Sequence, residues 1–274
     1  MAFRIPDIDE TQAPLLDHLI ELRTRLLRAF LAFAAAFGVC FYFSGDVFAF
    51  LVRPLTEAFP AGEGRLIYTK LYEAFFVEVK VALFAAFFVS FPVIANQIWA
   101  FVAPGLYAKE KKAFLPFLIA TPVLFTLGAA MAYYVVMPTA FHFFLSFQGS
   151  TGGLKLEALP GTGDYLGLVM QFILAFGISF LLPVLLMLLN RAGIISRQQT
   201  IAARRYVIVG IFIVAAIATP PDVISQLLLA VPLMGLFEGT LILMWFTERR
   251  DARANAAEEK APQASDGQAS APAE

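Results

Sequence analysis

The stretch Thr219-Pro220-Pro221-Asp222, TPPD, interrupts an apolar run that extends over residues 206–246. The residue before a proline is disfavoured in the helical region, and a proline lacks the N–H group that continues a helix. The run is therefore expected to form two helices joined by a tight turn. Asp222 is well suited to cap the second helix, because aspartate is a favoured N-cap and complements the positive helix end.

The helix before the turn is expected over residues 206–218 and is short. It rises about 20 Å at about 1.5 Å per residue, whereas the hydrocarbon core of a bilayer is about 30 Å thick. Either its end lies below the membrane surface or the bilayer thins beside it. In both cases Asp222 and Gln226, one turn apart, must face protein or water rather than lipid. Capping alone also accounts for Asp222, so a water-accessible concavity is one of two interpretations.

Composition places the whole chain in a membrane. Of 274 residues, 59% are hydrophobic and only 15% are charged, and the mean hydropathy is +0.75. These values exclude an ordinary soluble globular domain. The formal net charge of -1 gives no reason to expect a nucleic acid partner. Cys40 is the one cysteine, so the chain cannot form an internal disulfide.

The fold class predicted from the apolar runs is an all-α integral membrane protein with six transmembrane helices. The first run is kept as a membrane span rather than a cleaved signal peptide, because it continues without a polar cleavage region. The expected spans cover residues 26–43, 75–101, 114–136, 165–189, 206–218 and 223–246.

Basic residues predict the orientation of the spans. They concentrate in alternate connecting segments and at both chain ends, notably Lys109, Lys111, Lys112, Arg191, Arg197, Arg204 and Arg205. The positive-inside rule then places both termini in the cytoplasm. The predicted organisation is a cytoplasmic N-terminal segment 1–25, a six-helix transmembrane domain 26–246 and a disordered cytoplasmic tail 247–274. On the outside, a loop of about 30 residues joins the first two spans, and only TPPD joins the last two.

Prolines inside the spans predict bent helices. They are Pro92, Pro116, Pro122, Pro183 and Pro232. Each should kink its helix or leave a carbonyl free, which suits a curved wall. Such kinks are also common in membrane proteins without a functional reason.

Three stretches carry a more specific signal: HLIELRTRLLR at residues 18–28, QIWAFVAPGLYAKEKK at 97–112 and TPPDVISQ at 219–226. In this order, they resemble the TatC family, the multispanning receptor subunit of the twin-arginine protein translocase. The resemblance extends from Leu15 to about Glu238 and includes SFPVIANQIWAF, AYYVVMPTAF and FGISFLLPV. It implies a concave, glove-like bundle in the bacterial cytoplasmic (inner) membrane, with short fifth and sixth helices.

The resemblance also implies partners. The family recognises signal peptides with consecutive arginines on folded cargo, then assembles with single-span subunits such as TatA and TatB to export the cargo, in a receptor complex expected to hold several copies of the chain. A guanidinium matches a carboxylate through two parallel hydrogen bonds. Glu21 and Glu110 match the family's acidic positions for this task, and Leu22, Arg23 and Phe101 match positions in the same region.

Other positions match residues that the family uses for transport or partner contact. These are Pro54, in the predicted first external loop, Tyr133, Asp222, Gln226 and Glu238. Gly235 and Gly239 frame Glu238 in a G-x-x-x-G pattern that permits close helix approach. Leu181 departs from the family, which commonly carries Glu or Gln at that position in the fourth span.

Simpler interpretations remain for several of these residues. Glu21 can form a helix pair with Arg25, worth a few tenths of a kcal/mol, and Glu238 can face a partner helix or reach the cytoplasmic surface. An intramembrane enzyme is disfavoured, since His18 and His142 are the only histidines and no H-E-x-x-H or G-x-S-x-G pattern occurs. A small-solute transporter using Asp222, Gln226 and Glu238 is the other alternative. No cofactor or metal is expected.

Overall fold

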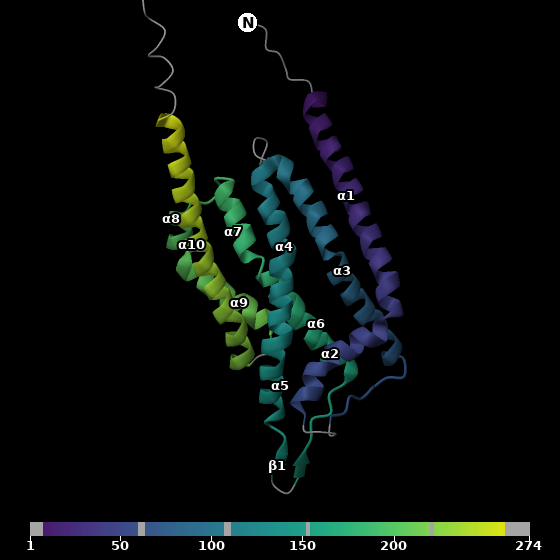
Figure 1. The fold of residues 1–274 in the computed structure, drawn as a ribbon. Coiled ribbons are helices and arrows are strands. Elements are labelled where there is room, and N and C mark those ends of the chain that lie inside the picture. Colours follow the sequence, from purple (N-terminus) through teal and green to yellow (C-terminus); the bar gives the residue numbers. More distant parts are fainter. Residues whose placement is uncertain (1–7, 60–63, 107–110, 152–153, 220–221, 261–274) are drawn as a thin grey trace, which may run out of the picture.

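The structure is a computed structural model that describes residues 8–59, 64–106, 111–151, 154–219 and 222–260. Its elements are α1 (Ile8–Tyr42), α2 (Ser44–Ala58), α3 (Glu73–Leu106), α4 (Lys111–Met131), the π-helix η1 (Ala132–Val136), α5 (Met137–Leu145), β1 (Gly149–Thr151), β2 (Leu154–Leu156), α6 (Thr162–Ser179), α7 (Leu182–Arg191), α8 (Arg197–Ala202), α9 (Arg204–Ala218) and α10 (Val223–Lys260). Figure 1 shows α1 beside α3 on one side and α8–α10 on the other, with α4 between them.

Five stretches in the described part of the chain are long and apolar enough to cross a membrane. They are His18–Tyr42, Glu73–Phe101, Pro116–Leu145, Thr162–Arg191 and Val223–Arg250, and they coincide with five of the six predicted spans. The remaining predicted span is α9, whose 15 residues rise about 22 Å. The short fifth helix is therefore present, and the count of six crossings stays a prediction. The expectation of a short sixth helix was wrong, because α10 continues over 38 residues from Val223 to Lys260 and its apolar part is long enough to cross a membrane.

Proline positions account for two interruptions in the long spans. The fourth span divides into α6 and α7 at Phe180 and Leu181, with Pro183 in the first turn of α7, as the kink prediction requires. In the third span, Pro138 is the second residue of α5, which begins directly after η1. Because Pro138 cannot donate a backbone hydrogen bond, the widened π turn absorbs the break, and the helix continues past the predicted end at residue 136.

The prediction that Pro54 lies in an external loop without secondary structure was wrong. Residues 44–58 form α2, and Pro54 is buried inside that helix together with Leu51 and Leu55. The apolar residues of α2 lie on one face and pack against the bundle. This packing stabilises the helix although it contains a proline. The all-α prediction also needs a small addition, because β1 and β2 pair antiparallel at the tip of the loop after α5.

Backbone and side-chain hydrogen bonds join the loop before α3 to the loop before α6. Ile67 forms a bridge with Gly161, and Thr162 N–H donates to the Ile67 carbonyl at 2.8 Å. Glu73 accepts hydrogen bonds from Gly163 N at 2.8 Å and from Thr69 N at 2.7 Å. The loops before α3 and α6 are therefore held together by one carboxylate and one backbone bridge.

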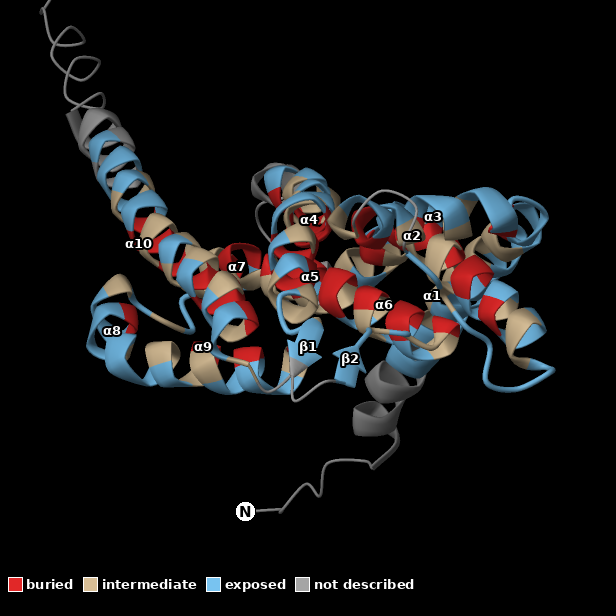
Figure 2. Ribbon diagram, turned by 90° about the horizontal axis from the view of Figure 1, so that it is seen from below, coloured by how far each residue is buried: buried red, intermediate tan, exposed pale blue. Residues whose placement is uncertain are grey.

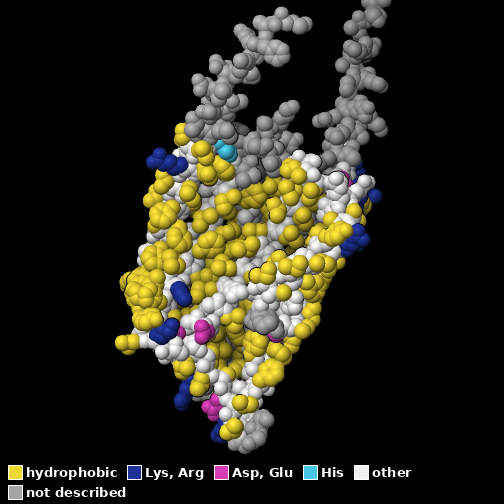
Figure 3. All heavy atoms as spheres, turned by 180° about the vertical axis from the view of Figure 1, so that it is seen from behind, with side chains coloured by type: hydrophobic (Ala, Val, Ile, Leu, Met, Phe, Trp, Pro, Cys, Tyr) yellow, Lys and Arg dark blue, Asp and Glu magenta, His cyan; other side chains and the backbone are white. Residues whose placement is uncertain are grey.

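The core is centred on α6, and much of the outer surface is apolar. Phe172 and Phe176 of α6 are fully buried, together with Val81, Val136 and Ala215 from neighbouring helices, and Figure 2 shows the buried residues gathered around α6. Figure 3 shows broad hydrophobic areas between basic residues at the ends of the molecule. Exposed residues such as Leu26, Phe30 and Leu31 suit contact with lipid rather than water.

Helical structure crosses both predicted domain boundaries. α1 runs through residues 25 and 26 without a break, and α10 continues to Lys260, so residues 247–260 of the predicted tail are helical. The boundaries themselves remain predictions, and residues 261–274 lie outside the described part of the chain.

Candidate functional site

Asp222 caps α10, as the sequence predicts. Its Oδ2 accepts a hydrogen bond from Ser225 N at 2.7 Å. Its other carboxylate oxygen, Oδ1, is buried without a hydrogen-bond partner among the described residues, as is the hydroxyl of Ser225. The cap thus satisfies one backbone N–H group at the start of α10. The Oδ1 atom can still accept a hydrogen bond at the turn of the α9–α10 hairpin, where it is buried from solvent.

Side chains from two neighbouring helices hold the short helix α9. Gln226 Nε2 of α10 donates to the Phe212 carbonyl at 3.2 Å, and Gln171 Nε2 of α6 donates to the Ile217 carbonyl at 3.3 Å. Thr219, which is buried, donates its hydroxyl to the Ala215 carbonyl at 2.9 Å. Carbonyls near a helix end need such partners in the absence of water. Pro220 and Pro221 of the TPPD turn lie outside the described residues.

Pro54 and Tyr133, which are far apart in sequence, meet at one carbonyl. Pro54 has no N–H group to donate to the Phe50 carbonyl four residues earlier. The Tyr133 hydroxyl of η1 donates to that carbonyl instead, at 2.7 Å. The rings of Tyr133 and Phe50 also stack, with centroids 4.3 Å apart and planes 7° apart. The residue matched in the predicted loop and the residue matched in the third span therefore act on the same carbonyl: Pro54 leaves it without a helical donor, and Tyr133 supplies one.

A second tyrosine reinforces the attachment of α2. The buried Tyr165 of α6 donates its hydroxyl to the Leu51 carbonyl at 2.8 Å. On the exposed side of α2, Arg53 Nε donates to Glu57 at 2.8 Å, and this bond raises the pKa of Arg53 above its ordinary value. Two hydroxyl donors thus fix the proline-containing helix against η1 and α6.

At the opposite end of the molecule, Glu21 lies in a small cluster on α1 and α3. Arg25 Nε donates to Glu21 Oε1 at 2.8 Å, which confirms the helix pair considered above. His18 Nδ1 lies 3.8 Å from Glu21 Oε2, and the His18 ring stacks on Phe101 with centroids 4.2 Å apart. His18 therefore connects Glu21 with Phe101.

Sequence reasoning missed His18, although it begins the HLIELR motif and stands three residues before Glu21, on the same helix face. Leu22 and Arg23 are exposed next to this cluster. Glu110, the second predicted carboxylate, lies outside the described residues.

Glu238 of α10 forms an ion pair with Arg204 at the start of α9. Glu238 Oε2 lies 2.8 Å from Arg204 Nη2, and each side chain is about half exposed, at 47% and 48%. The pair explains how an acidic residue can sit within a predicted membrane span. A Cβ atom added at Gly235 or Gly239 would meet no atom within 4 Å, so the face of α10 that carries this glycine pattern is open within the chain.

An apolar cavity of about 600 Å³ is lined by residues of α3, α4, α6, α7, α9 and α10. Its lining includes Trp99 of α3, Leu181 and Leu185 at the α6–α7 break, Val214 of α9 and Leu233 of α10. Thr121 and Ser179 contribute the polar side chains of this wall, and Thr121 already accepts a hydrogen bond from Trp99 Nε1 at 2.8 Å. Leu181 thus leaves the cavity without an ionisable group in its lining.

The described side chains contain no cluster of three or more His, Cys, Asp or Glu residues that could hold a metal ion. The features with distinct chemistry among these residues are the ends of the helices, the apolar cavity and the polar contacts described above.

Comparison with known proteins shows which family the chain belongs to. Residues 17–232 match the family model described as Sec-independent protein translocase protein (TatC). The chain belongs to the TatC family. It is 48% identical over 250 residues to the Sec-independent protein translocase protein TatC of Magnetococcus marinus, covering 91% of this chain and 90% of that protein. It is 40% identical over 231 residues to that of Escherichia coli strain K12, covering 84% and 87%.

The fold agrees with solved TatC structures. A crystal structure of the twin-arginine translocase receptor TatC in the detergent DDM superposes with a TM-score of 0.72 at 39% identity, covering 82% of this chain and 98% of that one. A second TatC crystal structure gives a TM-score of 0.71. The chain is therefore a multi-pass membrane protein and a component of the Tat translocase, which confirms the resemblance seen in the sequence motifs.

Proposed function

We propose that this chain is the receptor core of the Tat translocase in the bacterial cytoplasmic (inner) membrane. It binds twin-arginine signal peptides of folded proteins at the cytoplasmic face and assembles with single-span TatA- and TatB-like subunits to export them. Both termini are cytoplasmic, and the helices form a concave bundle of six spans. The observation that carries the proposal is the cluster of Glu21, His18 and Phe101 on two membrane helices.

Glu21 is suited to release Arg25 and to bind an arginine of the signal peptide in its place. Its side chain is 35% exposed and already binds the guanidinium of Arg25. An arginine of the signal can replace Arg25 and form the same charge-assisted bonds, which a lysine ammonium cannot reproduce in fork geometry. Because one guanidinium is exchanged for another, the net affinity is modest and the selectivity resides in the geometry. Glu110 supplies the second carboxylate, and Leu22 and Arg23 position the helix.

The apolar segment of the signal occupies the apolar cavity. Trp99, which lines the cavity, stands two residues before Phe101 on α3, so the two side chains leave α3 on different faces. A peptide with its arginines at Glu21 must therefore cross α3 to place its apolar residues against Trp99 and Leu181. The apolar lining favours such a segment over a polar one, because burying unpaired polar groups there costs free energy.

The remaining matched residues act in transport and partner contact. Pro54 and Tyr133 hold α2 in place, Asp222 and Gln226 hold the α9–α10 hairpin, and Glu238 fixes the start of α9 through Arg204. Single-span subunits pack on the exposed face of α9 and on the open glycine face of α10, and further copies of the chain join the same receptor complex.

The test is binding of a fluorescent signal peptide to the full chain in nanodiscs, with paired arginine compared with paired lysine. We expect Glu21→Ala and Glu110→Ala each to weaken binding of the arginine peptide about tenfold or more, since a hydrogen bond to a charged group contributes about 1.5–3 kcal/mol. Glu57→Ala is the matched control, because Glu57 also binds an arginine four residues away but lies on α2. Equal binding of both peptides, or unchanged binding in both variants, contradicts the receptor site.

A further inference from the structure

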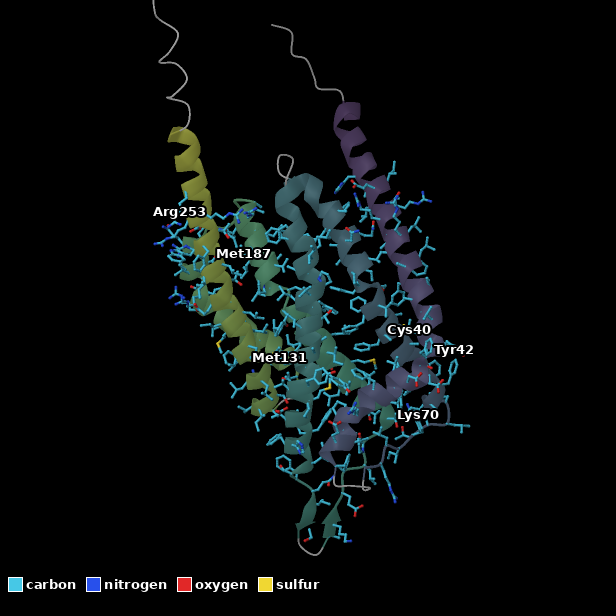
Figure 4. The ribbon with its side chains drawn as sticks, in the orientation of Figure 1. Cys40, Tyr42, Lys70, Met131, Met187 and Arg253 are labelled. Carbon is cyan, nitrogen blue, oxygen red and sulfur yellow. The ribbon has the colours of Figure 1, made fainter. Side chains whose placement is uncertain are left out.

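A second groove lies between α4, α7 and α10, away from the cluster at Glu21. It has a volume of about 400 Å³. Phe117 and Leu124 of α4, Met187 of α7 and Leu243 of α10 form its apolar floor, and Arg191 and Arg250 stand at one end. Figure 4 labels Met187 on α7, close to the upper part of α10.

The lining follows one face of each helix toward the arginines. On α7, Pro183, Met187 and Arg191 recur every four residues, and on α10, Leu243, Thr247 and Arg250 recur every three or four. From Pro183 to Arg191 the helix rises about 12 Å. The groove is therefore apolar along its floor and ends in two guanidinium groups. The C-terminal end of α7 lies at the same end of the molecule as the start of α1 (Figure 1).

The two arginines differ from neighbouring basic residues in their partners. Arg197 is paired with Glu248 and Arg204 with Glu238, while Arg249 lies over the Trp245 ring at 3.9 Å. Among the described residues, Arg191 and Arg250 have no carboxylate within salt-bridge distance. The Thr247 hydroxyl already donates to the Leu243 carbonyl at 2.9 Å, so the donors available at this end of the groove are guanidinium groups.

We propose that this groove is a binding site for an anionic phospholipid, with the phosphate at Arg191 and Arg250 and one acyl chain along the apolar floor. Guanidinium groups bind phosphate oxygens in parallel pairs of hydrogen bonds, and basic pockets between membrane helices are suited to anionic headgroups.

Native mass spectrometry of the full chain, purified in detergent and titrated with dioleoyl phosphatidylglycerol or dioleoyl phosphatidylcholine, tests the headgroup. Both lipids carry a phosphate, but the quaternary ammonium of phosphatidylcholine cancels its charge. We expect about tenfold tighter binding of the anionic lipid, because its net negative charge lies near two arginines. The double variant Arg191→Gln, Arg250→Gln should bind the two lipids within about twofold of each other. The double lysine variant should lie between, because it keeps the charge and loses the fork.

Arg205→Gln is the matched control for charge. Arg205 is on the same group of helices but stacks on Tyr206 at 4.8 Å outside the groove, so its removal should leave the lipid preference unchanged. Thermal unfolding of each variant checks that it is folded. A preference that survives the double glutamine variant, or equal binding of both lipids to the wild type, overturns the proposal.

A separate substitution tests whether an acyl chain lies along the apolar floor of the groove. Ala120 lines the groove on α4, and Ala120→Phe should occupy the space of the acyl chain and weaken retention of the anionic lipid. In nanodiscs with phosphatidylglycerol brominated in its acyl chains, quenching of Trp99, which packs against the same apolar cluster, should decrease in this variant. If the substitutions at Arg191, Arg250 and Ala120 leave lipid retention unchanged but weaken binding of a single-span subunit or a second copy, the groove is a protein interface and the proposal is wrong.

Discussion

Two helix pairs in this molecule use glycine in opposite ways. Between α4 and α6, a Cβ atom on Gly128 would lie 2.5 Å from the Phe176 carbonyl oxygen, and one on Gly177 would lie 2.7 Å from Phe125. On α9 and α10, a Cβ atom on Gly210, Gly235 or Gly239 would meet nothing within 4 Å. The first glycines complete a contact inside the chain, whereas the second border open space: Gly210 lines the apolar cavity, and Gly235 is exposed on α10.

The largest expected effect breaks the α4–α6 contact. Gly128→Ala places a methyl group against the backbone of α6, which cannot rotate away as a side chain could. We expect a loss of about 2–4 kcal/mol in the free energy of unfolding, at or above the usual cost of overpacking. Denaturant unfolding of the full chain in detergent measures this.

Gly235→Ala is the matched control for that substitution. It adds the same methyl group where the chain leaves space, and should change stability by less than about 1 kcal/mol, in the stabilising direction that alanine has in a helix. Equal destabilisation by the two substitutions would remove the distinction between a closed and an open glycine face.

The sequence indicated the open glycines and not the closed ones. The G-x-x-x-G pattern at Gly235 and Gly239 is recognisable because two glycines recur on one helix face. Gly128 and Gly177 stand on different helices, and their importance depends on where α4 and α6 cross. No local pattern contains that information, whereas the apolar runs, the short α9 and the cap at Asp222 depend only on neighbouring residues and were predictable.

The next prediction concerns the carbonyl that Pro54 leaves without a helical partner. Tyr133→Phe removes the hydroxyl that donates to the Phe50 carbonyl, and leaving that partly buried acceptor unpaired should cost about 1–2 kcal/mol of stability. Tyr134→Phe is the control, because Tyr134 is 68% exposed and should cost about 0.5 kcal/mol or less.

A double substitution sharpens this assignment. In a Pro54→Ala background, the N–H of residue 54 can donate to the Phe50 carbonyl, so Tyr133→Phe should then cost less than it does in the wild type. An unchanged cost would mean that the Tyr133 hydroxyl contributes independently of the N–H group that Pro54 lacks. Sequence reasoning missed this contact because it placed Pro54 in a loop, and a tertiary hydrogen bond to a proline-freed carbonyl requires the positions of both helices.

Substitutions at Asp222 in the α9–α10 hairpin should lower stability less than the preceding ones, since the glycine face of this hairpin is open. Asp222→Ala removes the cap on Ser225 N and should cost about 1 kcal/mol, whereas Asp222→Asn retains an oxygen that can cap and should cost a few tenths. Export of a twin-arginine reporter separates capping from charge. If transport needs the carboxylate, export falls in both variants while signal-peptide binding remains; if it needs only the cap, Asp222→Asn exports normally.

The smallest expected effect lies at the other end of α9. Glu238 and Arg204 are each about half exposed, so water and salt screen their attraction, and such a pair contributes about 0–1 kcal/mol. Glu238→Gln should therefore change the unfolding free energy of the isolated chain by less than about 1 kcal/mol, with a smaller difference at high salt. Its effect on co-purification of a single-span subunit is a separate measurement. A loss of the subunit without a loss of stability would mean that the position of α9, and the open glycine face beside it, matters to a partner more than to the fold.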